Sequence, residues 1–124
     1  MTTQEPSTSG APVRRFKDPA YRPQAATLGE LRARIDALDA QIVALMSERA
    51  LCVRDATRFK LDEFQVSAPA RQAQVFDRVR GLAAANEGNF PGLPDIVESA
   101  YRALVAGFIA GEGRFFHDTE RITP

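Results

Sequence analysis

The most regular pattern in the chain is an apolar seam between Thr27 and Phe59. Its residues recur at alternating steps of three and four, the spacing of one buried helical face. They are Leu28, Leu31, Ile35, Leu38, Ile42, Leu45, Cys52, Ala56 and Phe59. Thr27 followed by Glu30 forms a capping box, which indicates the first turn. Because no proline and no later glycine interrupts it, the pattern predicts one long helix over residues 27–59.

Arg49 occupies a seam position that the pattern would give to an apolar residue. An arginine among aliphatic side chains costs several kcal/mol unless an anion meets it there. The anion that meets Arg49 can be either a carboxylate of the protein or a bound ligand, and the spacing alone does not decide between them.

The rest of the chain predicts two further helices. Residues 60–67 read as a loop, and Ser67 with Pro69 suggests the cap and first turn of a second helix that ends near Asn86. Its apolar positions are Val75, Phe76, Val79, Leu82 and Ala83. Residues 86–94 are rich in Gly, Pro and Asn and predict a second loop.

A third helix is expected to begin at Pro94 or Asp95. It presents one apolar stripe, which consists of Val97, Tyr101, Leu104, Phe108 and Phe115. The fold class is therefore all-α, a three-helix protomer with one long N-terminal helix. We expect a helical domain over residues 27–116, a flexible N-terminal tail over 1–26 and a C-terminal tail over 117–124.

The predicted length of the first helix argues for a dimer. At 1.5 Å per residue it runs about 50 Å, whereas a compact globule of this size is only about 35 Å across. The helix should therefore extend past its own domain with an apolar seam that needs a partner. An intertwined homodimer is the simplest prediction.

Composition narrows the classes of partner. The 124 residues include sixteen basic and sixteen acidic ones, which gives no support to nucleic-acid binding or to an anionic membrane surface. No apolar run approaches the length of a membrane span. The N-terminus shows no hydrophobic segment before a cleavage site, so we expect a cytoplasmic protein. The single cysteine, Cys52, is expected to be an inert hydrophobe of the seam.

Two isolated features leave alternatives open. The N-terminal tail contains four basic residues around two aromatic ones, namely Arg14, Arg15, Lys17, Arg22, Phe16 and Tyr21. It is either a solvated tail or a segment that folds over an anionic site. His117, alone near the C-terminus, is expected to be a solvated residue rather than a base.

Three cations of the first helix could bind an anionic substrate. Arg49 and Lys60 are eleven residues apart, so they share one helical face about 16 Å apart along the axis, and their side chains can converge on a small dianion. Arg32 lies about 25 Å before Arg49 and must come from an antiparallel partner if it joins the site. The alternatives are an Arg32–Asp36 pair and a solvated Lys60.

These segments resemble a known family. LRARIDALD, ALMSER and ATRFK resemble the first helix of the all-helical (AroQ-type) chorismate mutases, in which cations fall at the positions of Arg32, Arg49 and Lys60. Three segments look more like the isochorismate-pyruvate lyase branch of the family than like its housekeeping mutases. They are RFK at 58–60, the short loop after it and APAR at 68–71. The resemblance covers roughly residues 28–116.

The resemblance implies a role for each matching residue. Arg32 arrives from the other subunit, Arg49 binds a substrate carboxylate, and Lys60 donates to the ether oxygen and a carboxylate. Phe108 belongs to the matching part of the third helix and is expected to line the substrate site. No metal and no organic cofactor takes part, because such pericyclic reactions need a compact conformer and stabilised charge on the ether oxygen.

Two residues depart from the family pattern. Glu112 stands where the family commonly has a glutamine that hydrogen-bonds the ether oxygen, and an ionised glutamate cannot donate that bond. Our hypothesis is that Glu112 works protonated, with a rate favoured by acid. The alternative is a pair with Arg49 or Arg114 in an inactive or repurposed site. Ala70 stands where related enzymes often have a glutamate that contacts the ring hydroxyl.

The expected function is therefore a cofactor-independent enzyme acting on a small dicarboxylate. It converts isochorismate to salicylate plus pyruvate, chorismate to prephenate, or both. A second possibility is a mutase for chorismate or 4-amino-4-deoxychorismate in secondary metabolism. From a different class, the chain could be a non-catalytic helical dimer with a regulatory or binding role. Glu112 and Ala70 favour the last of these, whereas Arg32, Arg49 and Lys60 oppose it.

Overall fold

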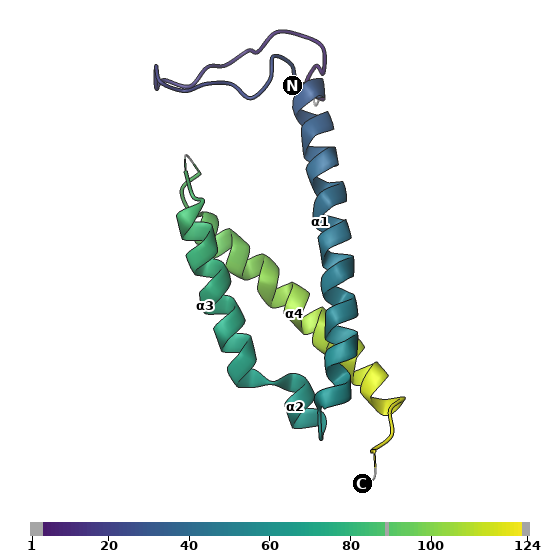
Figure 1. Ribbon diagram of the computed structural model, residues 1–124. Helices are drawn as coiled ribbons and strands as arrows, with labels where there is room; N and C mark the ends of the chain where they lie inside the picture. Colours follow the sequence, from purple (N-terminus) through teal and green to yellow (C-terminus); the bar gives the residue numbers. More distant parts are fainter. Residues whose placement is uncertain (1–3, 89, 123–124) are drawn as a thin grey trace. The chain divides into compact units, whose positions relative to one another are not determined.

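The computed structural model describes residues 4–88 and 90–122, and it is all-helical, with no strand in that part of the chain (Figure 1). In order, the elements are α1 (Leu28–Ala56), a 3₁₀ turn η1 (Thr57–Phe59), α2 (Glu63–Ser67), α3 (Pro69–Ala85) and α4 (Leu93–His117). The predicted class is confirmed: three main helices, the longest at the N-terminus. The chain divides into two compact units, Met1–Ser47 and Glu48–Pro124.

The start of α1 follows the predicted capping pattern. Thr27 Oγ1 accepts a hydrogen bond from the Glu30 amide at 3.2 Å, and Glu30 Oε2 accepts one from the Ala26 amide at 3.1 Å. The glutamate thus reaches one residue further back than a standard capping box requires. The α-helix ends at Ala56, three residues before the predicted end, because the chain tightens into η1.

The N-terminal segment is irregular in its described part, residues 4–26, and contacts the first turns of α1. The Gly29 amide donates to the Thr8 carbonyl at 2.9 Å, and Arg34 Nη1 donates to the Gln24 carbonyl at 2.7 Å. Carbonyl groups of the tail therefore satisfy one amide that the first turn of the helix leaves free and one arginine side chain further along α1.

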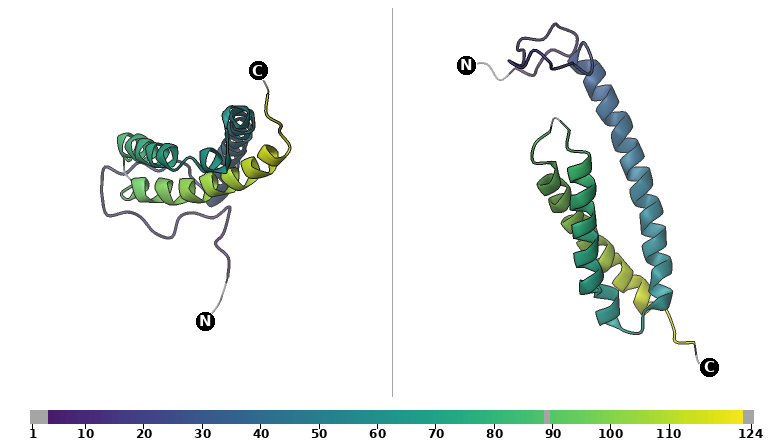
Figure 2. Two further views of the ribbon diagram at one scale, coloured as in Figure 1. Left: turned by 90° about the horizontal axis from the view of Figure 1, so that it is seen from below. Right: turned by 60° about the vertical axis from the view of Figure 1, so that its left-hand side comes forward.

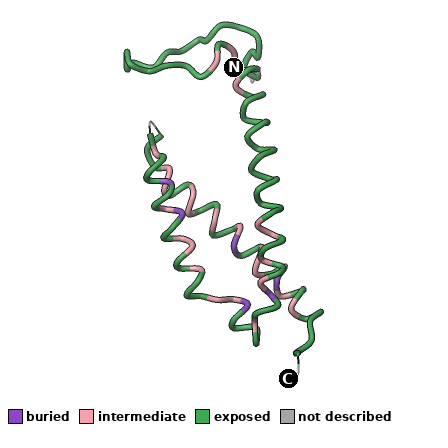
Figure 3. The backbone as a smooth tube through the Cα atoms, viewed as in Figure 1, coloured by how far each residue is buried: buried purple, intermediate pink, exposed green. Residues whose placement is uncertain are grey.

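The middle of the apolar seam of α1 is exposed in the single chain. No residue of α1 is buried. In the first unit Ile35, Leu38 and Ile42 each expose more than half of their surface, at 55%, 54% and 53%. Most of α1 is coloured as exposed in Figure 3. An isolated chain therefore leaves a regular helical row of large apolar side chains in contact with water.

The second unit is built on α3 and α4, which lie side by side (Figure 2), with α2 packed on α4. Its buried apolar residues are small, namely Val66, Val79, Ala83 and Val105. Val79 and Ala83 belong to the predicted stripe of the second helix, whereas Leu82 of that stripe is 51% exposed. A core of so few small side chains stabilises the unit only modestly.

The predicted loop at residues 60–67 contains a short helix instead. Asp62 caps α2, since its Oδ1 accepts from the Gln65 amide at 2.9 Å, and Gln65 Oε1 accepts from the Leu61 amide. Asp62 and Gln65 therefore act as a capping pair that the sequence already contained. Ala68, in the left-handed region at φ 46°, separates α2 from α3 and takes the capping position predicted for Ser67.

An ion-pair network joins α3 to the start of α4. Arg80 Nη1 lies 2.8 Å from Asp95 Oδ1 and 3.0 Å from Glu98 Oε1, and Arg102 Nε lies 2.8 Å from Glu98 Oε2. The hydrogen bond from Arg102, and then that from Arg80, lowers the pKa of the half-buried Glu98 carboxyl. The hydrogen bonds to Asp95 and Glu98 raise the pKa of Arg80.

No helix in the described part of the chain is both long enough and apolar enough to cross a membrane.

Candidate functional site

A cavity of about 310 Å³ lies within the second unit. Its walls come from the end of α1, from α2, from the start of α3 and from the middle of α4. Apolar side chains form most of the surface, namely Val53, Val66, Val75, Val105, Phe108 and Ile109. A cavity of this size, with a few polar groups on an apolar wall, has the properties of a small-molecule site.

Arg49 lies in this wall and is half-buried. Its guanidinium carbon stands 5.1 Å from the ring centre of Phe108 and 5.9 Å from that of Tyr101, so two aromatic faces of α4 support it. Across residues 4–88 and 90–122, no carboxylate forms an ion pair with Arg49. The seam arginine thus has aromatic neighbours and a free charge that faces the cavity, which favours a ligand over a protein carboxylate.

Lys60 reaches the same cavity from just beyond η1. Its backbone is extended, and its Nζ donates to the Gln65 carbonyl of α2 at 3.0 Å and lies 3.4 Å from Glu112 Oε2. Only 21% of its side chain is exposed. The alternative of a solvated lysine at the helix end is therefore wrong, because α2 and α4 hold its amine in place.

Glu112 of α4 is the most deeply buried charged residue of the described chain, with 6% of its side chain exposed. Its ion-pair partner is Lys60, and not Arg49 or Arg114 as the alternative interpretation proposed. The approach of 3.4 Å does not have hydrogen-bond geometry, so Oε2 is a buried oxygen without a hydrogen-bond partner among the described residues. Such an atom in a cavity wall calls for a ligand that bonds it.

Two further polar residues, Arg71 and Gln72, line the cavity from the first turn of α3. Gln72 Nε2 donates to the Ser67 carbonyl at 2.7 Å. The first turn of a helix also carries free amides and a positive dipole, which favour an anion. Sequence reasoning did not assign these two residues to the site, although Gln72 continues the stripe of Val75 and Val79 by three residues, a signal that could have revealed it.

Other candidates lie elsewhere. Arg32 belongs to the first unit, and no Arg32–Asp36 ion pair occurs among the described residues. Ala70 is absent from the cavity wall. His117 is exposed, as expected, but it is the last residue of α4 and its Nε2 lies 3.1 Å from Glu63 Oε1.

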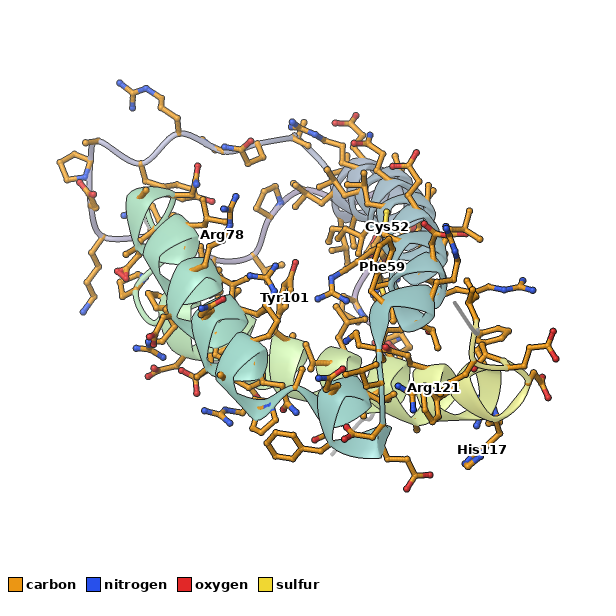
Figure 4. All side chains as sticks on the ribbon, turned by 60° about the horizontal axis from the view of Figure 1, so that its bottom comes forward. Cys52, Phe59, Arg78, Tyr101, His117 and Arg121 are labelled. Atoms are coloured by element: carbon orange, nitrogen blue, oxygen red, sulfur yellow. The ribbon has the colours of Figure 1, made fainter. Side chains whose placement is uncertain are left out.

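Cys52 was expected to be an inert hydrophobe of the apolar seam, and the structure places its side chain at the surface. Its side chain is exposed and lines the cavity, one turn after Arg49 on α1 (Figure 4). Its exposure comes from its position in the cavity wall.

Among residues 4–88 and 90–122, no group of three or more His, Cys, Asp or Glu side chains is placed to hold a metal ion.

Comparisons with known proteins complete the description of the site. No curated protein matches this chain. Among protein families, residues 31–113 match chorismate mutase type II. The matched range includes every residue of the cavity wall and covers well over half of the sequence. Its all-helical fold, with a long N-terminal helix, is consistent with that match, and the chain belongs to the chorismate mutase type II family.

Proposed function

We propose that this chain is a cofactor-independent pericyclic enzyme whose substrate is a chorismate-type dianion bound in the cavity of the second unit. Family membership supports chorismate mutase activity. The observation that carries the proposal is the buried Oε2 of Glu112, which has no hydrogen-bond partner among the described residues, in a wall that also presents Arg49, Lys60 and Arg71. A substrate with two carboxylates and an ether oxygen can satisfy all four groups.

The cations bind the carboxylates and fix the substrate's conformation. Arg49 presents a planar guanidinium, which suits a bidentate contact to one carboxylate. Arg71, in the first turn of α3, offers a second cation for the other carboxylate. Phe108, which supports Arg49, forms part of the apolar floor. Binding in a compact conformer supplies much of the rate enhancement, because the reacting atoms are already close together.

Lys60 and Glu112 act at the ether oxygen. In the mutase reaction the ether C–O bond breaks as a C–C bond forms to the ring, and negative charge develops on that oxygen. The Lys60 ammonium donates to it, and Glu112 in its protonated form donates a second hydrogen bond. Donors that are already in place stabilise this charge without reorganisation.

The same site can carry out the lyase reaction. In isochorismate the ether C–O bond breaks while a ring hydrogen moves to the pyruvyl methylene, which releases salicylate and pyruvate. The stretch 58–60 and the residues around Ala70 favour this branch. Because Ala70 offers no polar group, we assign Gln72 to the contact with the substrate's ring substituent. Its amide oxygen can accept a hydrogen bond from a hydroxyl or from an amine equally well.

The working enzyme is an intertwined homodimer with Arg32 supplied in trans. The exposed row on α1 supports this proposal, since Ile35, Leu38, Ile42 and Leu45 each expose more than half of their surface in the single chain. Arg32 lies on the same helix, so a partner that covers this row brings a further cation with it. We further propose that residues 27–116 form the catalytic domain, between two tails, and that the enzyme is cytoplasmic.

One experiment distinguishes the candidate activities. The purified protein is incubated separately with chorismate, isochorismate and 4-amino-4-deoxychorismate, and the products are identified by chromatography. Salicylate with pyruvate indicates the lyase, prephenate the chorismate mutase, and an amino-prephenate the secondary-metabolism mutase. If no substrate is converted while the protein remains folded and dimeric, the chain is the non-catalytic helical dimer and the proposed enzyme function is wrong.

A further inference from the structure

The thiol of Cys52 opens into a cavity that is already set up for an anionic ligand. Cys52 is the sole cysteine of the sequence, and it is exposed at the wall. An independent feature of the same wall points to a ligand: Oε2 of the nine-tenths-buried Glu112 lies 3.4 Å from Lys60 Nζ but has no hydrogen-bond partner among the described residues. A molecule that occupies this cavity therefore comes within reach of the sulfur.

The charges around Cys52 select the kind of molecule that reaches it. Three cations, Arg49, Lys60 and Arg71, and one carboxyl group, that of Glu112, are the charged residues in the wall. Arg49 precedes Cys52 by three residues on α1, which places their Cβ atoms roughly 5–6 Å apart. A concave, positively charged site raises the local concentration of small anions, so anionic reagents reach the sulfur in preference to neutral ones.

We propose that Cys52 is a covalent modification site inside the cavity, selective for low-molecular-weight disulfides that carry carboxylates. The Cys52 thiolate attacks one sulfur of the reagent. The reagent's S–S bond breaks as a new one forms to Cys52, and the other half leaves as a thiolate, so no further oxidant is needed. The attached group occupies the cavity, and a free thiol removes it by the reverse exchange.

The consequence for catalysis rests on the proposed function. A group joined to Cys52 takes up the space beside Arg49 that the substrate needs, so modification inhibits turnover reversibly. Selective labelling itself does not depend on turnover, because it requires only the cavity, its charges and the thiol.

The test compares the rates at which two aromatic disulfides react with Cys52 of the full-length protein. Dithionitrobenzoate carries a carboxylate on each ring, whereas dithiodipyridine is neutral, and both release a chromophore. The ratio of their rates with the folded protein is divided by the same ratio for N-acetylcysteine amide. We expect a preference for the anionic reagent of about tenfold or more at low ionic strength, which decreases as salt is added.

Matched variants connect the preference to the cavity. Arg71→Gln should reduce it severalfold with little change for the neutral reagent, whereas Arg78→Gln, on the same helix but outside the cavity, should not. Cys52→Ala should show no labelling. Equal preferences for the folded protein and the free thiol, or a thiol that reacts only after denaturation, would overturn the proposal.

A second readout uses chorismate turnover. In an active preparation, labelling should abolish turnover and dithiothreitol should restore it, while the reagent should leave turnover by Cys52→Ala unchanged. Full turnover by the labelled protein would contradict blockage of the cavity. A preparation that shows no turnover before labelling would count against the proposed function, and the labelling ratio would still decide the assignment of Cys52.

Discussion

The Nζ atom of Lys60 lies 3.4 Å from Oε2 of Glu112, close enough for an ion pair but without hydrogen-bond geometry. Lys60 comes from the segment after η1 and Glu112 from the middle of α4, so the packing of the second unit is what brings them together. Both groups line one cavity.

The hypothesis that Glu112 donates a hydrogen bond to the ether oxygen predicts an acid-favoured reaction. If Glu112 must carry a proton to donate to the ether oxygen, kcat/KM should decline as the pH is raised from 5 to 9. Glu112→Gln, whose amide donates at every pH, should show a flatter profile and hold its rate at high pH. Steady-state kinetics of the two proteins measure this, and parallel profiles would show that the proton on Glu112 is not required.

Loss of the Arg49 guanidinium should impair catalysis strongly. Arg49→Ala removes the charge that faces the cavity, and we expect kcat/KM to fall by about 10²-fold or more, as when a charged binding group is removed. Arg54→Ala is the matched control, since Arg54 lies on the same helix, over the ring of Phe115 and outside this cavity. Circular dichroism checks that both variants fold, and equal kinetic losses would remove Arg49 from the site.

The cap of α2 should act on Lys60. Asp62→Ala removes the acceptor for the Gln65 amide, which costs about 1 kcal/mol at a helix N-cap. It also loosens the turn whose carbonyl holds Nζ. We expect a severalfold lower kcat/KM for Asp62→Ala, recovered in Asp62→Asn, which still caps.

A double-mutant comparison separates this effect from general destabilisation. In a Lys60→Met background, Asp62→Ala should cause no further kinetic loss, because the group that it positions is already gone. A full additional loss in that background would mean that the cap acts independently of Lys60.

The Arg80–Glu98–Arg102 network should make stability sensitive to acid. The hydrogen bonds from Arg102 and Arg80 lower the pKa of Glu98 below its ordinary value of 4.5. A carboxyl group whose pKa is lower in the folded than in the unfolded protein stabilises the fold at pH values above its pKa in the unfolded protein. This contribution is lost as the pH falls through its pKa in the folded protein. Thermal denaturation should therefore show a smaller loss of Tm below pH 4.5 for Glu98→Gln than for the wild type. Identical acid profiles would contradict this role.

The supply of Arg32 in trans predicts complementation between inactive variants. Arg32→Ala and Arg49→Ala chains should each be nearly inactive alone. After they are mixed, unfolded and refolded together, half of the dimers are hybrids with one intact site each, so about a quarter of wild-type activity should return. Activity that stays at the level of the separate variants would place Arg32 outside the site or in the same chain's site.

Local features of the sequence determined the helices. The three-four spacing and the Thr27 cap predicted α1 to within a few residues, and Pro69 and Asn86 marked the ends of α3 closely. These signals are short-range, because a helix is fixed by hydrogen bonds four residues apart and by side chains one turn apart. The capping pair of Asp62 and Gln65 was equally local, and α2 could have been predicted from it.

The set of residues that line the cavity depends on packing between segments far apart in the chain. The helical spacing of Arg49 and Lys60 pointed to one site, but Lys60 lies beyond the helix, and it reaches the cavity because Gln65 and Glu112 hold its amine. Arg71 and Gln72 entered the wall only through the placement of α3. The positions of Phe108 and Glu112 came from resemblance to a family.

The sequence by itself thus determined an all-helical chain and identified Arg49 as a charge that needed an anion. The tertiary structure decided which residues share the cavity, that Glu112 keeps a buried oxygen without a hydrogen bond, and that Cys52 is exposed there. The physical reason is the range of the interactions. Periodicity and capping act within a few residues, whereas burial and convergence of side chains depend on how segments far apart in the chain pack.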